Sequence, residues 1–145
     1  MRIIMKKTNL DETIKIGKFF LDAEQFNVPK KVMVDFTAAR GSRYDDNGKE
    51  QDEVQKYTLN AVDVKTGQAL VNANINLGKY EGVVLEVLGA LDIVEGLIEK
   101  DTVDVVKLIN PRVKPLWVAR GNSGSFSKVK LVVDAIELDV QSTGA

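Results

Sequence analysis

Hydrophobic and polar residues alternate along the first half of the chain with a period of two. The alternation begins over residues 32–39, where Val32 and Val34 share one side, and it recurs over residues 54–64 and 69–77. Such a period places successive side chains on opposite faces of a strand, so that one face can be buried. The pattern therefore predicts three consecutive β-strands.

The segment between the first two predicted strands, residues 41–53, reads GSRYDDNGKEQDE and interrupts the alternation. Its Asn47-Gly48 pair favours the positive φ angles of a tight hairpin turn. The carboxylates of this segment lack the spacing of a calcium-binding loop, which has Gly at position six and Glu at position twelve. A solvated hairpin turn is therefore predicted in place of a metal site.

After Gly78 the period becomes that of a helix. Over residues 83–98 the apolar residues fall at spacings of three and four, and acidic residues occupy the other side. This pattern predicts one amphipathic helix. Gly82, Gly89 and Gly96 recur every seven residues and disfavour a helix interior, so they indicate either close packing or a helix broken into two pieces.

Strand-like alternation returns over residues 103–109 and again over 129–133, with a loop that contains Pro and Gly between them. The apolar phase then slips by one residue before Ile136, and a β-bulge near Asp134-Ala135 would explain the slip. We therefore predict two further strands after the helix.

The predicted order of elements is strand-strand-strand-helix-strand-strand. This is the connectivity of the five-stranded OB-fold barrel. In that fold a ligand crosses the second and third strands, between the loop that joins the first two strands and the loop that joins the last two. We expect a mostly β OB-fold domain with one helix over residues 28–140. An N-terminal arm over residues 1–27 would precede it, and a disordered tail over residues 141–145 would follow.

The chain has 145 residues, 44% of them hydrophobic, and contains neither cysteine nor histidine. The lack of cysteine excludes disulfides and thiolate chemistry, and the lack of histidine removes the commonest general base and transition-metal ligand. We expect a non-enzymatic protein that needs no cofactor and no metal. Because no apolar run reaches the length of a transmembrane helix or a signal peptide, we also expect a cytoplasmic protein without membrane contact.

The net charge is −1, but positive residues are concentrated in one segment. No acid occurs between Asp104 and Asp134, and apart from the cations of this segment the chain sums to −7. The six cations of the segment are Lys107, Arg112, Lys114, Arg120, Lys128 and Lys130. Such a division predicts an electropositive region that attracts a polyanion, on an otherwise acidic body.

Single-stranded DNA is bound by cations that follow its phosphates and by flat side chains on which its bases stack. Both kinds of residue occur in the two predicted flanking loops and on the second predicted strand. The candidate phosphate contacts are Arg40, Arg43, Lys56, Arg112, Lys114, Arg120 and Lys128. The candidate stacking residues are Tyr44, Tyr57, Trp117 and Phe126. The pattern leaves open whether Trp117 and Tyr57 face DNA or the core.

Three segments, FNVPKKVMVDFTAARGSRYDDNG, VDVVKLINPRVKPLWVARGNSGSFSKV and DAIELDV, carry a resemblance to a known family. With them the whole chain resembles the PrgE-like single-stranded-DNA-binding proteins encoded with conjugation genes on Gram-positive plasmids. More distantly, VKLINPRV and DAIEL resemble helicase-processivity proteins of conjugative elements. The first resemblance implies an OB-fold that binds single-stranded DNA non-specifically and assembles along it through its N-terminal arm.

We therefore expect a protein that coats single-stranded DNA largely independently of sequence, in conjugative plasmid transfer or replication, and that binds double-stranded DNA more weakly. Self-association along DNA through the arm is expected as well. The alternative is a protein-interaction adaptor that recruits a helicase or a relaxase and whose basic loops meet an acidic partner. Sugar binding would use the aromatic side chains without the cations.

Overall fold

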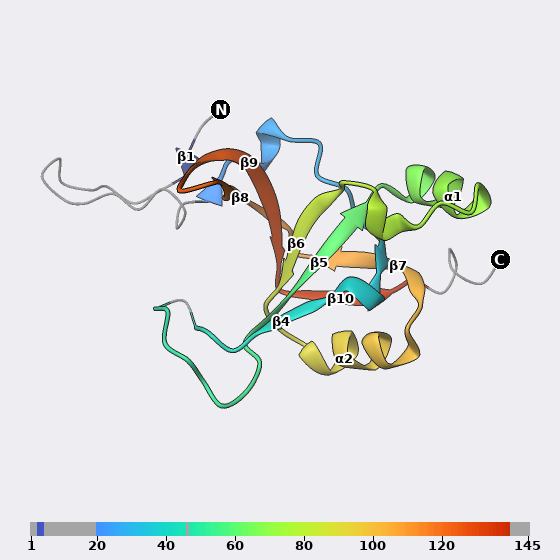
Figure 1. The fold of residues 1–145 in the computed structure, drawn as a ribbon, viewed down its shortest axis with the longest axis horizontal. Helices are drawn as coiled ribbons and strands as arrows, with labels where there is room; N and C mark the ends of the chain where they lie inside the picture. Colours follow the sequence, from blue (N-terminus) through green and yellow to red (C-terminus); the bar gives the residue numbers. More distant parts are fainter. Residues whose placement is uncertain (1–2, 5–19, 46, 140–145) are drawn as a thin grey trace, which may run out of the picture.

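The chain folds into one mixed β-sheet against which two α-helices pack (Figure 1). The computed structural model describes residues 3–4, 20–45 and 47–139. The predicted tail and most of the predicted arm lie outside these ranges. Within them, no helix is both long and apolar enough to cross a membrane.

Ten strands form the sheet in the described part of the chain. They are β1 (Ile3–Ile4), β2 (Phe20–Leu21), β3 (Lys31–Asp35), β4 (Arg40–Ser42), β5 (Lys56–Val62), β6 (Val83–Val87), β7 (Val103–Ile109), β8 (Arg112–Arg120), β9 (Ser123–Val133) and β10 (Ala135–Leu138). Their order across the sheet is β1-β2-β8-β9-β6-β5-β3-β7-β10, and β4 pairs with β5. The pairing of β6 with β9 is parallel, and the other pairings are antiparallel.

Two α-helices and three 3-10 helices connect the strands in the described residues. They are η2 (Ala23–Gln25), η3 (Phe36–Ala38), α1 (Val64–Asn72), η4 (Leu77–Lys79) and α2 (Leu91–Lys100). Helix α1 and η4 follow β5, and α2 joins β6 to β7. In Figure 1 the two α-helices lie at separate places beside the sheet.

The main core lies where β3, β6, β9 and α2 meet. Val34, Leu85, Val133 and Val94 from these elements are completely buried and belong to one hydrophobic cluster. A second, smaller cluster forms on the other side of β3, where α1 and η4 cover it. Its members, with the residues packed against them, are Met33, Val62, Leu77, Val105, Val64 and Leu70. Strand β3 is therefore buried on both faces.

The strands predicted over residues 54–64 and 103–109 are confirmed as β5 and β7, and the strand over 129–133 as the end of β9. The strand predicted over 32–39 is confirmed only as far as Asp35, because η3 follows it. The expected slip of the apolar phase lies at Asp134, which separates β9 from β10. Strand β9 pairs with β6, and β10 pairs with β7.

The strand predicted over residues 69–77 is wrong, because this segment holds the end of α1, a turn and the start of η4. The side chain of Asp63 caps α1 by accepting a hydrogen bond from the Thr66 amide (3.2 Å). Leu70 then packs against the smaller cluster, whereas Ile75 stays exposed. Tertiary packing thus selects the helix although the local pattern fits a strand.

The helix predicted over residues 83–98 is also partly wrong. Its first part is β6, whose Leu85 and Val87 enter the core with a period of two. Helix α2 begins only at Leu91, after Ala90 has adopted a left-handed conformation with φ of 48°. A Cβ on Gly89 would lie 2.7 Å from the Asp134 carbonyl oxygen, so this glycine permits close packing at the boundary. The expectation of one helix is corrected to two, and that of a mostly β fold is confirmed.

The Pro- and Gly-containing loop that the sequence predicted over residues 110–128 is a hairpin of β8 and β9. Gly121 turns the chain with φ of 62°, and the register of the pairing shifts between Leu116 and Trp117. Val113 and Pro115 are buried, while Lys114 between them faces the other side. The predicted turn near residue 48 is present: Gly48 has φ of 77°, and its amide donates to the Asp45 carbonyl (3.0 Å).

Replacement of Gly82 by Ala should destabilise the fold. A Cβ there would lie 2.2 Å from the Ala61 carbonyl oxygen, and backbone atoms cannot move aside cheaply. We expect a loss of about 1–3 kcal/mol in the free energy of unfolding, measured by chemical denaturation. The matched control is Gly96→Ala, in the interior of α2 with no atom within 4 Å of the new Cβ, which should stabilise by about 0.5–1 kcal/mol. Equal stability of the two variants would contradict the packing described at Gly82.

Candidate nucleic-acid interface

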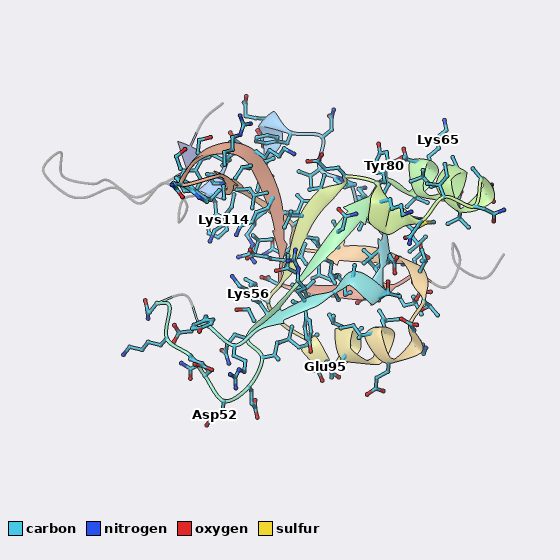
Figure 2. All side chains as sticks on the ribbon, viewed as in Figure 1. Asp52, Lys56, Lys65, Tyr80, Glu95 and Lys114 are labelled. Carbon is cyan, nitrogen blue, oxygen red and sulfur yellow. The ribbon has the colours of Figure 1, made fainter. Side chains whose placement is uncertain are left out.

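One face of β5, β6, β9 and β8 points away from the main core, and we call it the outer face. The alternate residues Leu59, Leu85 and Leu131 point into the core, so their neighbours in sequence point outward. The outer face carries Lys56, Thr58, Asn60, Val84, Glu86, Arg112, Lys114, Leu116, Lys128 and Lys130. Lys56 on β5 and Lys114 on β8 are labelled in Figure 2. Three of these four strands, β5, β8 and β9, thus bring together cations that are far apart in the sequence.

Carboxylates from other segments pair with the cations of the acid-free segment. Arg112 bonds to Asp134 (2.5 Å). Lys128 bonds to Glu81, and Lys130 bonds to Glu86 (2.5 Å). Residues 105–133 contain no acid, but the surface on which their cations lie does contain carboxylates. Among the described residues, five cations and three carboxylates meet on this face.

Glu86 lies between two lysines and joins three strands. Its carboxylate contacts Lys130 of β9 and, at 3.5 Å, Lys56 of β5. The residue is only 9% exposed, so water competes weakly for these charge-assisted bonds. This arrangement fixes the positions of both ammonium groups on the outer face.

Arg112 and Lys114 both contact the aromatic ring of Phe20. The Arg112 Cζ atom lies 5.2 Å from the ring centroid, and the Lys114 Nζ atom lies 4.6 Å from it, as in cation–π pairs. The Nε atom of Arg112 is buried and has no hydrogen-bond partner among the described residues. The next residue, Leu21, is buried and pairs with Val113. The described end of the predicted arm is therefore held on its own sheet.

An aromatic pair lies on the β8–β9 hairpin. Trp117 and Phe126 are 54% and 42% exposed, and their rings meet edge to face with centroids 5.2 Å apart. A Cβ on Gly124 would lie 2.7 Å from the indole, so only glycine leaves room for Trp117 to lie across β9. Trp117 is thus a surface residue and not part of the core.

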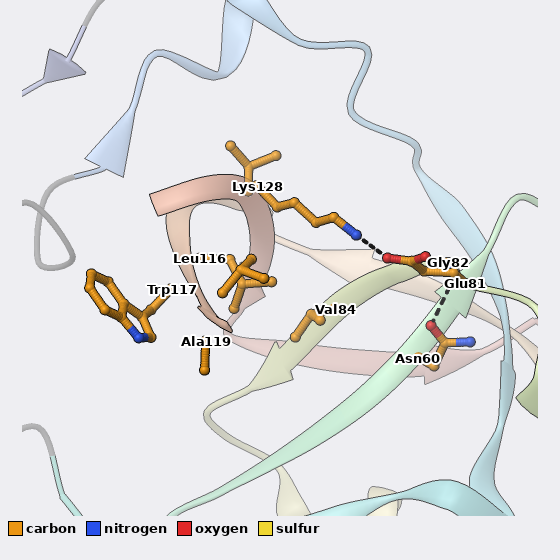
Figure 3. A pocket seen from close by; sticks show the side chains of 10 residues that line it. Asn60, Glu81, Gly82, Val84, Leu116, Trp117, Ala119 and Lys128 are labelled. Carbon is orange, nitrogen blue, oxygen red and sulfur yellow. Dashed lines mark hydrogen bonds and ion pairs between the residues drawn. The ribbon is translucent and has the colours of Figure 1, made fainter. Parts of the chain in front are cut away.

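A hollow of about 360 Å³ lies beside Trp117 on the outer face, and we call it the Trp117 hollow (Figure 3). Lys128 reaches from β9 toward Glu81, which precedes β6. The hydrogen bond from Lys128 and the charge of its ammonium group lower the pKa of Glu81. The lining residues are Asn60, Glu81, Gly82, Val84, Leu116, Trp117, Val118, Ala119, Lys128 and Val129. The hollow therefore combines mostly apolar walls with one ion pair.

Tyr57 lies on the opposite side of β5 from Lys56 and packs against the main core. Its hydroxyl donates a hydrogen bond to Glu95 of α2 (3.2 Å). Burial, and then the hydrogen bond and charge of Glu95, raise the pKa of Tyr57 above 10.0. The structure does not bring this candidate stacking residue to the outer face.

The remaining candidates lie in and next to the loop after β4 and at the tip of the hairpin. Arg40 is exposed on β4, and Arg43 bonds to Glu50. Tyr44 is exposed and forms an isolated bridge with Glu50. Arg120 is exposed at the end of β8 and, like Arg40, makes no ion pair with the described residues. The loop after β4 and the β8–β9 hairpin both extend toward the left of Figure 1.

The sequence did not reveal Glu81, Glu86, Asp134 and Phe20 as parts of this surface, because their partners lie on other strands. No family model, curated protein or solved structure matches the chain. The outer face, the aromatic pair and the Trp117 hollow are therefore the observations on which a function can be proposed.

Ionisation of Tyr57 should reduce stability at high pH. Its raised pKa means that the folded state favours the neutral phenol, so this stabilisation is complete below pH 10.0 and is lost as the pH rises through the higher folded pKa. In Tyr57→Phe the free energy of unfolding should therefore fall less steeply with pH in this window than in the wild type. Chemical denaturation at several pH values measures both slopes, and identical slopes would contradict the environment described for Tyr57.

Proposed function

We propose that this chain is an OB-fold protein that binds single-stranded DNA on the outer face, largely independently of sequence and without catalysis. The fold is supported by the antiparallel pairings of β3, β5 and β6, the position of α2, and the parallel pairing of β6 with β9. Because only Asp134 separates β9 from β10, the two act as one strand, the fifth after β3, β5, β6 and β7. This strand pairs with β6 through β9 and with β7 through β10. Helix α1 and strand β8 are then additions to the five-stranded plan.

The exposed pair of Trp117 and Phe126 is the observation that carries the DNA proposal. Large aromatic side chains are usually mostly buried, whereas Trp117 and Phe126 both expose a large part of their rings on one hairpin. Unpaired bases stack on such rings, and each stack contributes about 1–3 kcal/mol. Trp117 lines the Trp117 hollow together with Lys128, one of the cations of the outer face, and these cations would follow the phosphates.

Ion pairs on the outer face limit how much its cations can contribute to the affinity for DNA. Phosphate binding gains free energy mainly by releasing counterions from the nucleic acid. Lys56, Arg112, Lys128 and Lys130 already have carboxylate partners, so DNA must compete with those partners for them. We therefore propose that stacking contributes a larger share of the affinity than the number of cations alone would suggest.

Self-association along DNA is part of the proposal and rests on the sequence resemblance, as does a role in plasmid transfer or replication. Phe20 and Leu21 are held on β8 of their own chain. Ile3 and Ile4 pair with them in turn, so the described part of the predicted arm packs on its own sheet, and a link to a neighbouring molecule through the arm would use other residues of it.

The alternative function, a protein-interaction adaptor, has support from a second hollow of about 260 Å³. Tyr80 and Val83, both exposed, line it together with Thr66 of α1. Exposed apolar residues around a concavity are common at sites of protein association. Such an adaptor would use this surface and would bind oligonucleotides only weakly, through the cations of the outer face.

Replacement of Trp117 by Ala should weaken single-strand binding by about 1–3 kcal/mol, because one stacking surface is lost. Its exposure means that the melting temperature should change much less than for a core tryptophan, whose truncation costs about 3–5 kcal/mol. Fluorescence polarisation with labelled oligonucleotides measures the binding. Ile93→Ala, which truncates an exposed side chain on α2, is the control and should bind like the wild type. Unchanged binding by Trp117→Ala would remove the aromatic pair from the site.

A further inference from the structure

The Trp117 hollow contains few polar side-chain atoms that can meet a ligand. Asn60 is already engaged, since its Nδ2 atom donates to the Tyr80 carbonyl (3.1 Å) and its Oδ1 atom accepts from the Gly82 amide (3.1 Å). Apart from the indole N–H of Trp117, the groups that remain are those of Glu81 and Lys128. Any polar selectivity of the side chains that line the hollow must therefore come largely from this ion pair.

The ion pair leaves most of its hydrogen-bonding capacity unused. An ammonium group carries three donors, and a carboxylate carries two oxygens with about four acceptor sites. Their mutual bond uses one donor and one acceptor, and the side chains of Glu81 and Lys128 are 78% and 52% exposed. A ligand in the hollow would thus meet two acceptor oxygens next to one donor group.

The walls and size of the hollow suit a flat aromatic ring. Val84, Leu116 and Val129 provide apolar surface, and Trp117 lies at the border. The volume of about 360 Å³ lies near the lower end of the range of about 300–1,000 Å³ for small-molecule pockets. One unstacked nucleobase has the required apolar faces and polar edge.

The order of donors and acceptors distinguishes the four bases. The Watson–Crick edge of guanine presents two adjacent donors, N1–H and N2–H, next to the acceptor O6. Thymine presents one donor between two acceptors, and adenine and cytosine each present one amino group. Only guanine can therefore offer a donor to both oxygens of one carboxylate while it offers an acceptor to a neighbouring ammonium group.

We propose that the Trp117 hollow takes one unstacked guanine, which Glu81 recognises through N1–H and N2–H and Lys128 through O6. This inference rests on the proposed function and adds to it a preference at one nucleotide position. Glu81 is thereby a specificity-determining residue. Because both side chains are exposed to water, the preference is at the low end of bidentate base recognition, about fivefold in Kd.

The test uses the full chain and short oligo-dT strands in which one central base is replaced by guanine, adenine, cytosine or hypoxanthine. Fluorescence polarisation should give a Kd for the guanine strand that is about fivefold lower than for the adenine and cytosine strands. The hypoxanthine strand lacks the N2 amino group and should lose most of that gain. Equal affinity for guanine and hypoxanthine would overturn the bidentate contact.

Two variants assign the preference to a residue. Glu81→Gln keeps the shape of the side chain but replaces one acceptor with a donor, so the guanine strand should lose its advantage. Glu99→Gln makes the same change at an exposed position on α2 and should keep the advantage. A guanine preference that persists in Glu81→Gln would overturn the role of Glu81.

The outcomes separate this inference from the proposed function. If the unsubstituted oligo-dT strand binds and all four bases give the same Kd, the proposed function stands and the guanine site is wrong. If no strand binds, the proposed function and the guanine site are both wrong.

Discussion

The chain passes from β9 to β10 at Asp134, and this transition determines how the strands pair around the main core. Val133 and Ile136 are both completely buried, although residues three apart on a regular strand point to opposite faces. An irregularity at Asp134 resolves this conflict, and it lets one length of chain pair with β6 before it and with β7 after it. The Asp134 carboxylate also bonds to Asn110 (2.9 Å) and Arg112, next to the start of β8. Asp134 therefore also helps to fix where the β8–β9 hairpin begins.

The outer face shows how acidic residues organise a surface that the sequence suggested was purely basic. Glu86 and Asp134 hold Lys130 and Arg112 in defined positions, and Arg112 in turn lies against Phe20. Because the positive charge is partly balanced, binding cannot rest on charge alone. The exposed aromatic pair and the hollow beside it provide the shape and the stacking surface that charge does not.

The sequence predicted the strands whose local pattern and packing agree, and it failed where one pattern fits two structures. Residues 83–88 can be read as a helix face or as a buried strand, and only pairing with β5 and β9 makes them β6. Residues 69–77 alternate like a strand, but the cap at Asp63 and the packing of Leu70 on Met33 and its neighbours favour α1. In both segments the secondary structure depends on contacts with distant parts of the chain, and the local hydrophobic pattern carries no information about those contacts.

The candidate site was predictable in its residue types and not in its pairings. The sequence indicated Trp117, Phe126 and several cations as candidate contacts, and Trp117 lies on the surface. It gave no sign that Glu81 would meet Lys128 across 47 residues, because nothing local couples the two. It also placed Tyr57 among the stacking candidates, whereas the pairing of β5 turns that side chain toward Glu95 and the core.

Trp117 is the only tryptophan of the chain, so its fluorescence reports directly on the proposed site. The most direct test is a titration of the protein with unlabelled oligo-dT, in which tryptophan emission is followed alongside the polarisation of a labelled strand. We expect emission to be quenched in step with binding and the quenching to be reversed by added salt. Binding without any change in Trp117 emission would contradict the outer face as the site, and no binding at all would contradict the proposed function.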